Sequence, residues 1–140
     1  MSNLRLNYEV IAGDMSRAGE ASSAVKQTLR KMGFDSDTIR RVSVCMYEGE
    51  INMVIHANGG VAEVDVGLDD ITITLRDTGP GIPDISKAMQ EGFSTAGDHA
   101  RNLGFGAGMG LPNMKKYSDE MTVDSTIGVG TTVTMVIHAS

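Results

Sequence analysis

The stretch MYEGEINMVIHA (46–57) constrains the fold more than any other part of the chain. Glu48, Asn52 and His56 follow one another at four-residue intervals, and residues four apart share one face of a helix. The residues between them are mostly apolar, so the segment is expected to be a helix that is buried on several sides and lines a cleft with its polar row. An Asn oxygen suits Mg²⁺, and a nearby Glu can accept a proton from a hydroxyl group or a water molecule.

Glu50 belongs to the same stretch but to another face of the predicted helix. On an ideal helix it lies about 160° from Asn52, so we interpret it as facing away from the polar row, towards solvent or a partner protein. Gly49 precedes it, and a helical Gly costs about 1 kcal/mol relative to Ala. Either packing requires a small residue at this position, or the helix is distorted there.

The remaining segments alternate between strand and helix patterns. Strands are expected at 4–11, 61–68, 71–76, 121–125 and 131–139, and helices at 15–32 after a cap at Asp14, at 35–57, at 85–91 and at 111–119. The second and third strands form a predicted hairpin around Asp69 and Asp70. This order predicts one α+β domain over residues 1–140, a two-layer sandwich with a mixed, mostly antiparallel sheet and helices on one face.

Composition excludes several classes of protein. A net charge of −6 argues against a nucleic-acid surface, which needs clustered Lys and Arg. Cys45 is the one cysteine, so there is no disulfide framework, and we expect it to be a small core residue. No apolar run approaches membrane-spanning length, so we expect a cytoplasmic protein without a membrane segment.

The stretch DTGPGIPD (77–84) places a carboxylate at the end of a predicted strand. Gly79 and Gly81 allow a sharp turn and the close approach of a flat ligand. A buried Asp77 carboxylate needs a hydrogen-bond donor, and the exocyclic amine of adenine is one such donor. A tight surface loop with a solvated Asp is the alternative.

The stretch GFGAGMG (104–110) runs into a predicted helix. Glycine-rich backbone at a helix N-terminus offers unpaired N–H groups that bind phosphate. The spacing matches neither a P-loop nor a dinucleotide fingerprint, and the signatures of the common protein-kinase fold are absent. Residues 92–110 have almost no periodic pattern, which is typical of a functional lid or a disordered segment.

Taken together, four segments identify a family. Glu48-x-x-x-Asn52, DTGPGIPD, GAGMGL (106–111) and GVGTT (128–132) resemble, in this order, the N, G1, G2 and terminal Thr boxes of the gyrase, heat-shock-90, histidine-kinase and MutL ATPases (the Bergerat fold). Within that superfamily the chain is most similar to the bacterial anti-sigma-factor and switch serine/threonine kinases. GPGIPDISKAMQEGFST (79–95) is especially similar to the stressosome switch kinase.

The resemblance implies a role for each matching residue. Glu48 would be the general base, and Asn52 would hold Mg²⁺ at the ATP phosphates. Asp77 would accept the adenine amino group, and Thr131 would reach adenine through a water molecule, with Thr132 as the alternative register. The other implied ATP-binding residues are His56, Gly79, Gly81, Ile82, Arg101, Gly106, Gly108, Met109, Gly110 and Leu111. A purely structural His at a helix end is the alternative for His56.

The resemblance also implies an activity. It is that of an ATP- and Mg²⁺-dependent serine/threonine protein kinase acting on a small anti-sigma-factor antagonist or scaffold protein. The alternative is a nucleotide-dependent binding module that sequesters a sigma factor or activates a phosphatase. A homodimer is one expected state. A histidine-kinase catalytic domain is disfavoured because no helical hairpin with a phosphoacceptor His precedes the boxes, and a gyrase-like ATPase because no transducer domain follows them.

Overall fold

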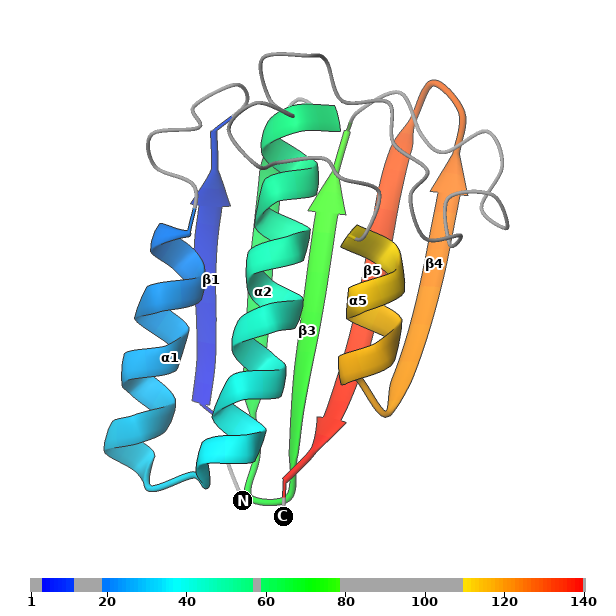
Figure 1. The fold of residues 1–140 in the computed structure, drawn as a ribbon. Helices are drawn as coiled ribbons and strands as arrows, with labels where there is room; N and C mark the ends of the chain where they lie inside the picture. Colours follow the sequence, from blue (N-terminus) through cyan, green and yellow to red (C-terminus); the bar gives the residue numbers. More distant parts are fainter. Residues whose placement is uncertain (1–3, 12–18, 57–58, 79–109, 140) are drawn as a thin grey trace.

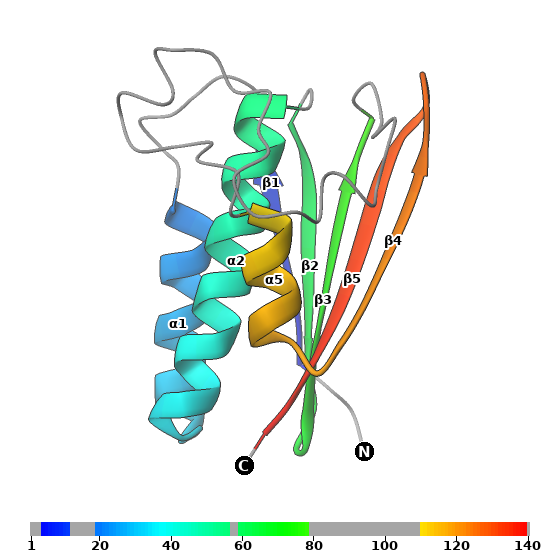
Figure 2. The same ribbon diagram turned by 45° about the vertical axis from the view of Figure 1, so that its right-hand side comes forward.

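The computed structural model describes residues 4–11, 19–56, 59–78 and 110–139, without the side chains of residues 55 and 56. The elements formed by these residues are β1 (Leu4–Val10), α1 (Glu20–Met32), α2 (Ser36–His56), β2 (Gly60–Val66), β3 (Asp70–Asp77), α5 (Gly110–Tyr117), β4 (Glu120–Thr126) and β5 (Gly130–His138). The three helices cover one face of the sheet, as the side view in Figure 2 shows. The predicted two-layer α+β sandwich is therefore confirmed.

The strands form one sheet in the order β1-β2-β3-β5-β4 (Figure 1). All four neighbouring pairs are antiparallel, in agreement with a mostly antiparallel sheet. β2 and β3 form the predicted hairpin. β5 lies between β3 and β4, and its register places Asp77 at the end of β3 opposite Thr131 at the start of β5.

Alternation along the strands separates a buried face from an open one. The side chains packed under the helices include Ala62, Val64, Val66, Ile71, Ile73, Leu75, Val133, Met135 and Ile137. The intervening residues lie on the open face, where threonines gather on the central strands and β4: Thr72, Thr74, Thr122, Thr132 and Thr134. The apolar core thus lies between the sheet and the helices.

Local signals set the ends of the helices. Asp35 caps α2, because its Oδ2 accepts the Thr38 N–H at 3.1 Å. At the end of α1, Gly33 adopts a left-handed φ of 87° and its N–H bonds to the Arg30 carbonyl, a common way to end a helix. The predicted start of the second helix near residue 35 and the predicted stop at Gly33 are therefore confirmed.

Packing between α2 and β3 explains the helical Gly49. A Cβ at this position would lie 2.1 Å from Leu75 Cδ1, too close for two carbon atoms that are not bonded to each other. Packing against β3 therefore requires a small residue at position 49, which was the first of the two explanations for this glycine.

Cys45 is the core residue that the sequence predicts. It is fully buried on α2, and burial raises the pKa of its thiol to about 12. Its Sγ donates to the carbonyl oxygen of Met114 on α5 at 3.7 Å. The residue therefore serves the α2–α5 contact and not a reaction.

Some expectations fall on parts of the chain outside the described residues. These are the helix cap at Asp14, the helix at 85–91 and the lid segment up to residue 109. Within the described residues, no helix is both long enough and apolar enough to cross a membrane.

Candidate active site

Asn52, from the polar row of α2, faces the start of α5. The two helices lie side by side (Figures 1 and 2). A Cβ added to Gly110, the first residue of α5, would lie 3.0 Å from Asn52 Oδ1. The Asn52 amide is therefore packed against the N-terminus of α5, where the first N–H groups of a helix are unpaired and the helix dipole is positive.

Glu48 lies one turn before Asn52 on the same face of α2, as the sequence predicts. Its side chain is half-buried, and burial is the main reason that its pKa is raised above the ordinary value. A hydrogen bond from the Asn113 side chain acts in the opposite direction and lowers the pKa. The net result is a carboxylate that is more basic than a solvated one, as a general base requires.

Asp77 and Thr131 meet at the end of the β3–β5 pair. The Thr131 N–H donates to Asp77 Oδ1 at 3.2 Å, and the Thr131 side chain is 7% exposed. Thr132 pairs with Arg76 on the open face. Of the two threonines considered for the adenine contact, Thr131 is therefore the one whose side chain shares a face with Asp77.

Ser125 is a member of this group that sequence reasoning missed. Its Oγ lies 2.8 Å from Thr131 Oγ1, at hydrogen-bonding distance. The two residues are directly opposite each other across the β4–β5 hairpin. Counting the strand register outward from the turn at 126–130 would place Ser125 opposite Thr131.

At Gly130 the backbones of β5 and β3 approach each other so closely that there is no room for a Cβ. Its φ is 146°, and a Cβ there would lie 2.1 Å from the carbonyl oxygen of Asp77. Any larger residue would separate the ends of β3 and β5. The glycine therefore keeps Thr131 next to Asp77.

Glu50 does not meet solvent or a partner, and that interpretation is wrong. It is 4% exposed, and its carboxylate accepts the N–H groups of Gly19 at 3.0 Å, Ala21 at 3.2 Å and Ser22 at 3.1 Å. α1 begins without a side-chain cap of its own, so its unpaired N–H groups and its dipole attract this buried carboxylate. The prediction that Glu50 faces away from Asn52 is correct, but its carboxylate binds the start of α1 in the same chain.

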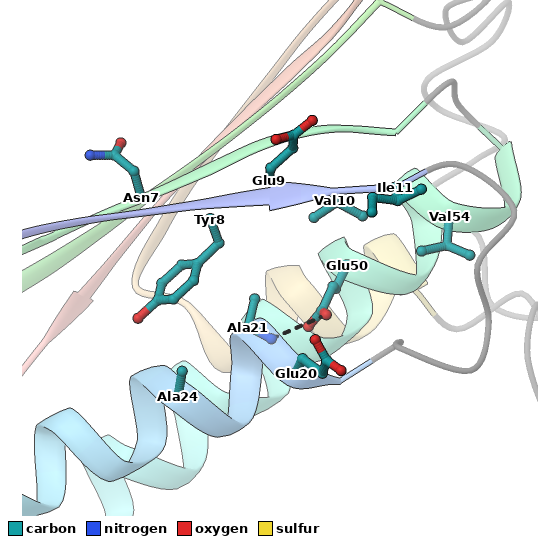
Figure 3. Close-up of a pocket in the computed structure, with 10 residues that line it drawn as sticks. All are labelled: Asn7, Tyr8, Glu9, Val10, Ile11, Glu20, Ala21, Ala24, Glu50 and Val54. Atoms are coloured by element: carbon teal, nitrogen blue, oxygen red, sulfur yellow. Dashed lines mark hydrogen bonds between the residues drawn. The ribbon is translucent and has the colours of Figure 1, made fainter.

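A cavity of about 420 Å³ lies between β1, α1 and α2, with Glu50 in its wall (Figure 3). Its lining residues are Asn7, Tyr8, Glu9, Val10, Ile11, Glu20, Ala21, Ala24, Glu50 and Val54. Glu48, Asn52 and Asp77 do not line it. The cavity is thus distinct from the Asn52–Gly110 contact and from the Asp77–Thr131 pair.

Most of the remaining predicted site residues lie in parts of the chain that the structure does not describe. Gly79, Gly81, Ile82, Arg101, Gly106, Gly108 and Met109 lie outside the described residues, as does the side chain of His56. Leu111 is buried in the first turn of α5, so only its backbone is available to a ligand. Among the described residues there is no group of three His, Cys, Asp or Glu side chains that would hold a metal ion.

The residues that are described fit a magnesium nucleotide better than a protein-bound metal alone. Asn52 offers one neutral oxygen beside a helix N-terminus. Mg²⁺ commonly takes one or two protein ligands and completes its shell with water and phosphate oxygens. The donor set is therefore consistent with a metal that arrives with phosphates.

Comparison with known proteins agrees with this geometry. Residues 11–137 match the family model described as the histidine kinase-like ATPase domain. The chain is 33% identical over 112 residues to the serine/threonine-protein kinase RsbT of Bacillus subtilis, covering 77% of this chain and 78% of that protein. It is also 32% identical over 108 residues to the anti-sigma F factor of Geobacillus kaustophilus, covering 73% and 70% of the two chains.

A solved structure shows the same fold at low sequence identity. The RsbU and RsbW domains of Rv1364c from Mycobacterium tuberculosis superpose with a TM-score of 0.65 at 16% identity, over 97% of this chain and 32% of that one. The match of residues 11–137 to the family model shows that the chain belongs to the histidine kinase-like ATPase domain family. The expected ATP-binding fold is confirmed, and so is the relation to serine/threonine kinases and anti-sigma factors.

Proposed function

We propose that this chain is an ATP- and Mg²⁺-dependent serine/threonine protein kinase that phosphorylates a small antagonist or scaffold protein in bacterial sigma-factor or stress regulation. The observation that carries the proposal is the placement of Glu48 and Asn52 one turn apart on α2, against the start of α5. The relationship to a protein named as a serine/threonine kinase supports it. We also propose a cytoplasmic location, where such regulators meet their partners.

At the phosphate end, the proposal assigns Asn52 to Mg²⁺ and the N-terminal N–H groups of α5 to phosphate oxygens. Bound MgATP supplies the phosphoryl group, whose transfer depends on positioning and charge neutralisation more than on covalent chemistry by the protein. Glu48 accepts the proton of the attacking Ser or Thr hydroxyl. Its burial favours this role, because a raised pKa makes a carboxylate a better proton acceptor.

At the adenine end, the proposal assigns recognition to Asp77 and Thr131. The hydrogen bond from the Thr131 N–H holds the Asp77 carboxylate beside the Thr131 hydroxyl, and Ser125 fixes that hydroxyl. A carboxylate and a hydroxyl together offer the acceptor that an exocyclic amine needs and a group that can bind a bridging water.

The test is phosphoryl transfer from labelled ATP to an antagonist-like or scaffold-like domain that carries an acceptor Ser or Thr. Glu48→Gln is expected to lower transfer by at least about 100-fold while ATP affinity stays within about twofold. Glu20→Gln, which changes an exposed carboxylate in the first turn of α1, is the matched control and should leave transfer unchanged. Absence of transfer by the native protein, or full transfer by Glu48→Gln, would contradict the proposal.

The relationship to anti-sigma F factors favours one alternative, a nucleotide-dependent binding module with little kinase activity. Such a protein would sequester a sigma factor or activate a phosphatase, as a monomer or a homodimer. Stable capture of a sigma factor in the presence of ATP, without transfer to any antagonist domain, would favour this alternative. Light scattering of the nucleotide-bound protein would show which oligomer is present.

A further inference from the structure

The Arg41 guanidinium joins three segments that are distant in the sequence. It lies on α2, and its side chain is only 18% exposed. Its Nε donates to Asp37 Oδ2 on the same helix at 3.1 Å. Its Nη1 donates to Asp119 Oδ2 at 3.0 Å, and its Nη2 donates to the carbonyl oxygen of His138 at 2.7 Å. Each nitrogen atom of the guanidinium therefore has its own acceptor, an arrangement that suits the planar fork of Arg and not the ammonium of Lys.

Asp119 follows the end of α5 by two residues and is itself held from several sides. Its Oδ2 also accepts the N–H of His138 at 2.7 Å, and its own N–H donates to the carbonyl oxygen of Val136 at 2.8 Å. The hydrogen bonds from the His138 N–H and from Arg41 lower the pKa of the Asp119 carboxyl group, which is therefore ionised at neutral pH. Arg41 and Asp119 thus fix the end of α5 to α2 and to β5.

α5 connects this junction with the opposite end of the α2–α5 contact. The helix has eight residues, which corresponds to a length of about 12 Å. At its first residue, Gly110, an added Cβ would lie 3.0 Å from Asn52 Oδ1. In its second half, the carbonyl oxygen of Met114 accepts a hydrogen bond from the Cys45 thiol at 3.7 Å. The two helices lie side by side (Figures 1 and 2), so a shift at the Asp119 end of α5 would move Gly110 relative to Asn52.

We propose that Arg41 is a positioning residue for the phosphate end of the nucleotide site: through Asp119 it holds α5 at the height on α2 where the N-terminal N–H groups of α5 bind phosphate oxygens beside Asn52. The proposal deepens the proposed function and rests on it for the place of the phosphates. The hydrogen bonds of Arg41 do not depend on that assignment. Position matters here because N–H groups bind an oxygen only within a narrow range of distance and angle.

The two ends of the nucleotide site are expected to respond differently to the loss of Arg41. β5 is paired along its length with β3 on one side and with β4 on the other, so Thr131 keeps its place beside Asp77. α5 has no such pairing, and its Asp119 end loses the guanidinium. Adenosine, which carries no phosphate, therefore tests the adenine end alone, whereas MgATP tests both ends.

The test measures the affinity of the full chain for MgATP by calorimetry and for adenosine by NMR titration. Arg41→Met removes the guanidinium and keeps most of the side-chain stem, and Arg30→Met is the matched control at an exposed Arg in the last turn of α1. Arg41→Met is expected to lower MgATP affinity about tenfold, the equivalent of one or two hydrogen bonds, with adenosine affinity unchanged within about twofold. Arg41→Lys should restore part of the MgATP affinity, and Arg30→Met should leave both affinities unchanged.

Asp119→Asn tests the same junction from the other side, with a smaller change in shape. It should lower MgATP affinity about threefold, because a charged acceptor becomes a neutral one, again without an effect on adenosine. In the double variant with Arg41→Met the two losses should not add, since both remove one interaction.

The outcomes separate the positioning role from its alternatives. If folded Arg41→Met binds MgATP as tightly as the native protein does, or if it loses affinity for MgATP and adenosine by the same factor, Arg41 has no specific effect on the phosphates and the proposal is overturned. Additive losses in the double variant would also overturn it. If the native protein binds MgATP no more tightly than adenosine, the assigned phosphate site and the proposed function fail, and the positioning role fails with them.

Discussion

Substitution of Glu50 is expected to destabilise the fold by an amount that can be worked out from its contacts. The carboxylate accepts three backbone N–H groups of α1, and hydrogen bonds to a charged group contribute about 1.5–3 kcal/mol each. Because such values are not additive for one side chain, we expect a loss of about 4 kcal/mol for Glu50→Ala, which leaves the three backbone N–H groups without this acceptor. For Glu50→Gln we expect about 2 kcal/mol, because one acceptor oxygen remains while the new amide N–H₂ faces a backbone donor.

Thermal and urea unfolding monitored by circular dichroism measure these losses. For a chain of this length, 1 kcal/mol corresponds to a shift in Tm of about 3–4 °C, so the two variants should unfold roughly 14 °C and 7 °C below the native protein. Glu9→Ala is the matched control, since it removes an exposed carboxylate at the same cavity. Its effect should stay within about 0.5 kcal/mol.

The refuting result is equally definite. If Glu50→Ala unfolds within about 2 °C of the native protein, the carboxylate does not stabilise the start of α1 and the reasoning fails. Below its unfolding temperature, Glu50→Gln should retain phosphoryl transfer, whereas Glu48→Gln should lose it. A reversal of these two outcomes would mean that the roles of the two carboxylates are exchanged.

Three further expectations concern packing, adenine recognition and pH. Gly49→Ala should lower the free energy of unfolding by about 1–3 kcal/mol in urea titrations, because the added methyl group collides with a β3 side chain; an unchanged urea midpoint would contradict this. Thr131→Val should weaken ATP binding about fivefold in calorimetry, the equivalent of one hydrogen bond, whereas equal weakening by Thr132→Val would refute the assigned register. The hydrogen bond that the His138 ring donates to the Asp70 carboxylate raises the pKa of His138. The stabilising effect of this bond is complete below the ordinary histidine pKa of about 6.5 and is lost as pH rises through the raised value. The urea midpoint of Asp70→Asn should thus fall below the native midpoint at pH 6 and approach it at pH 9, and an equal difference at both pH values would contradict the assignment.

Features encoded locally could be predicted from the sequence. The limits of α2 follow from a cap at Asp35 and from apolar periodicity, and the row of Glu48 and Asn52 follows from four-residue spacing alone. The β2–β3 hairpin follows from two alternating runs on either side of a short turn. Each of these signals lies within about twenty residues of chain.

Features that join distant segments could not be predicted in this way. Gly19, at the start of α1, is 31 positions away from Glu50 in the sequence. Helix geometry predicts the direction of the Glu50 side chain but not the segment that it contacts. The choice between Thr131 and Thr132 depends on the register of β5 against β3, which the strand pattern alone leaves open by one residue.

The burial of Cys45 has a practical consequence. The chain contains one cysteine, and a buried thiol with a pKa of about 12 offers almost no thiolate to maleimide or iodoacetamide at neutral pH. The native protein is therefore already a nearly unreactive background for site-specific labelling. A cysteine introduced at Thr122, exposed on the open face of β4, would carry a single dye on the side of the sheet away from the helices. Fluorescence from that dye could follow the docking of a partner without any change to the residues of the nucleotide site.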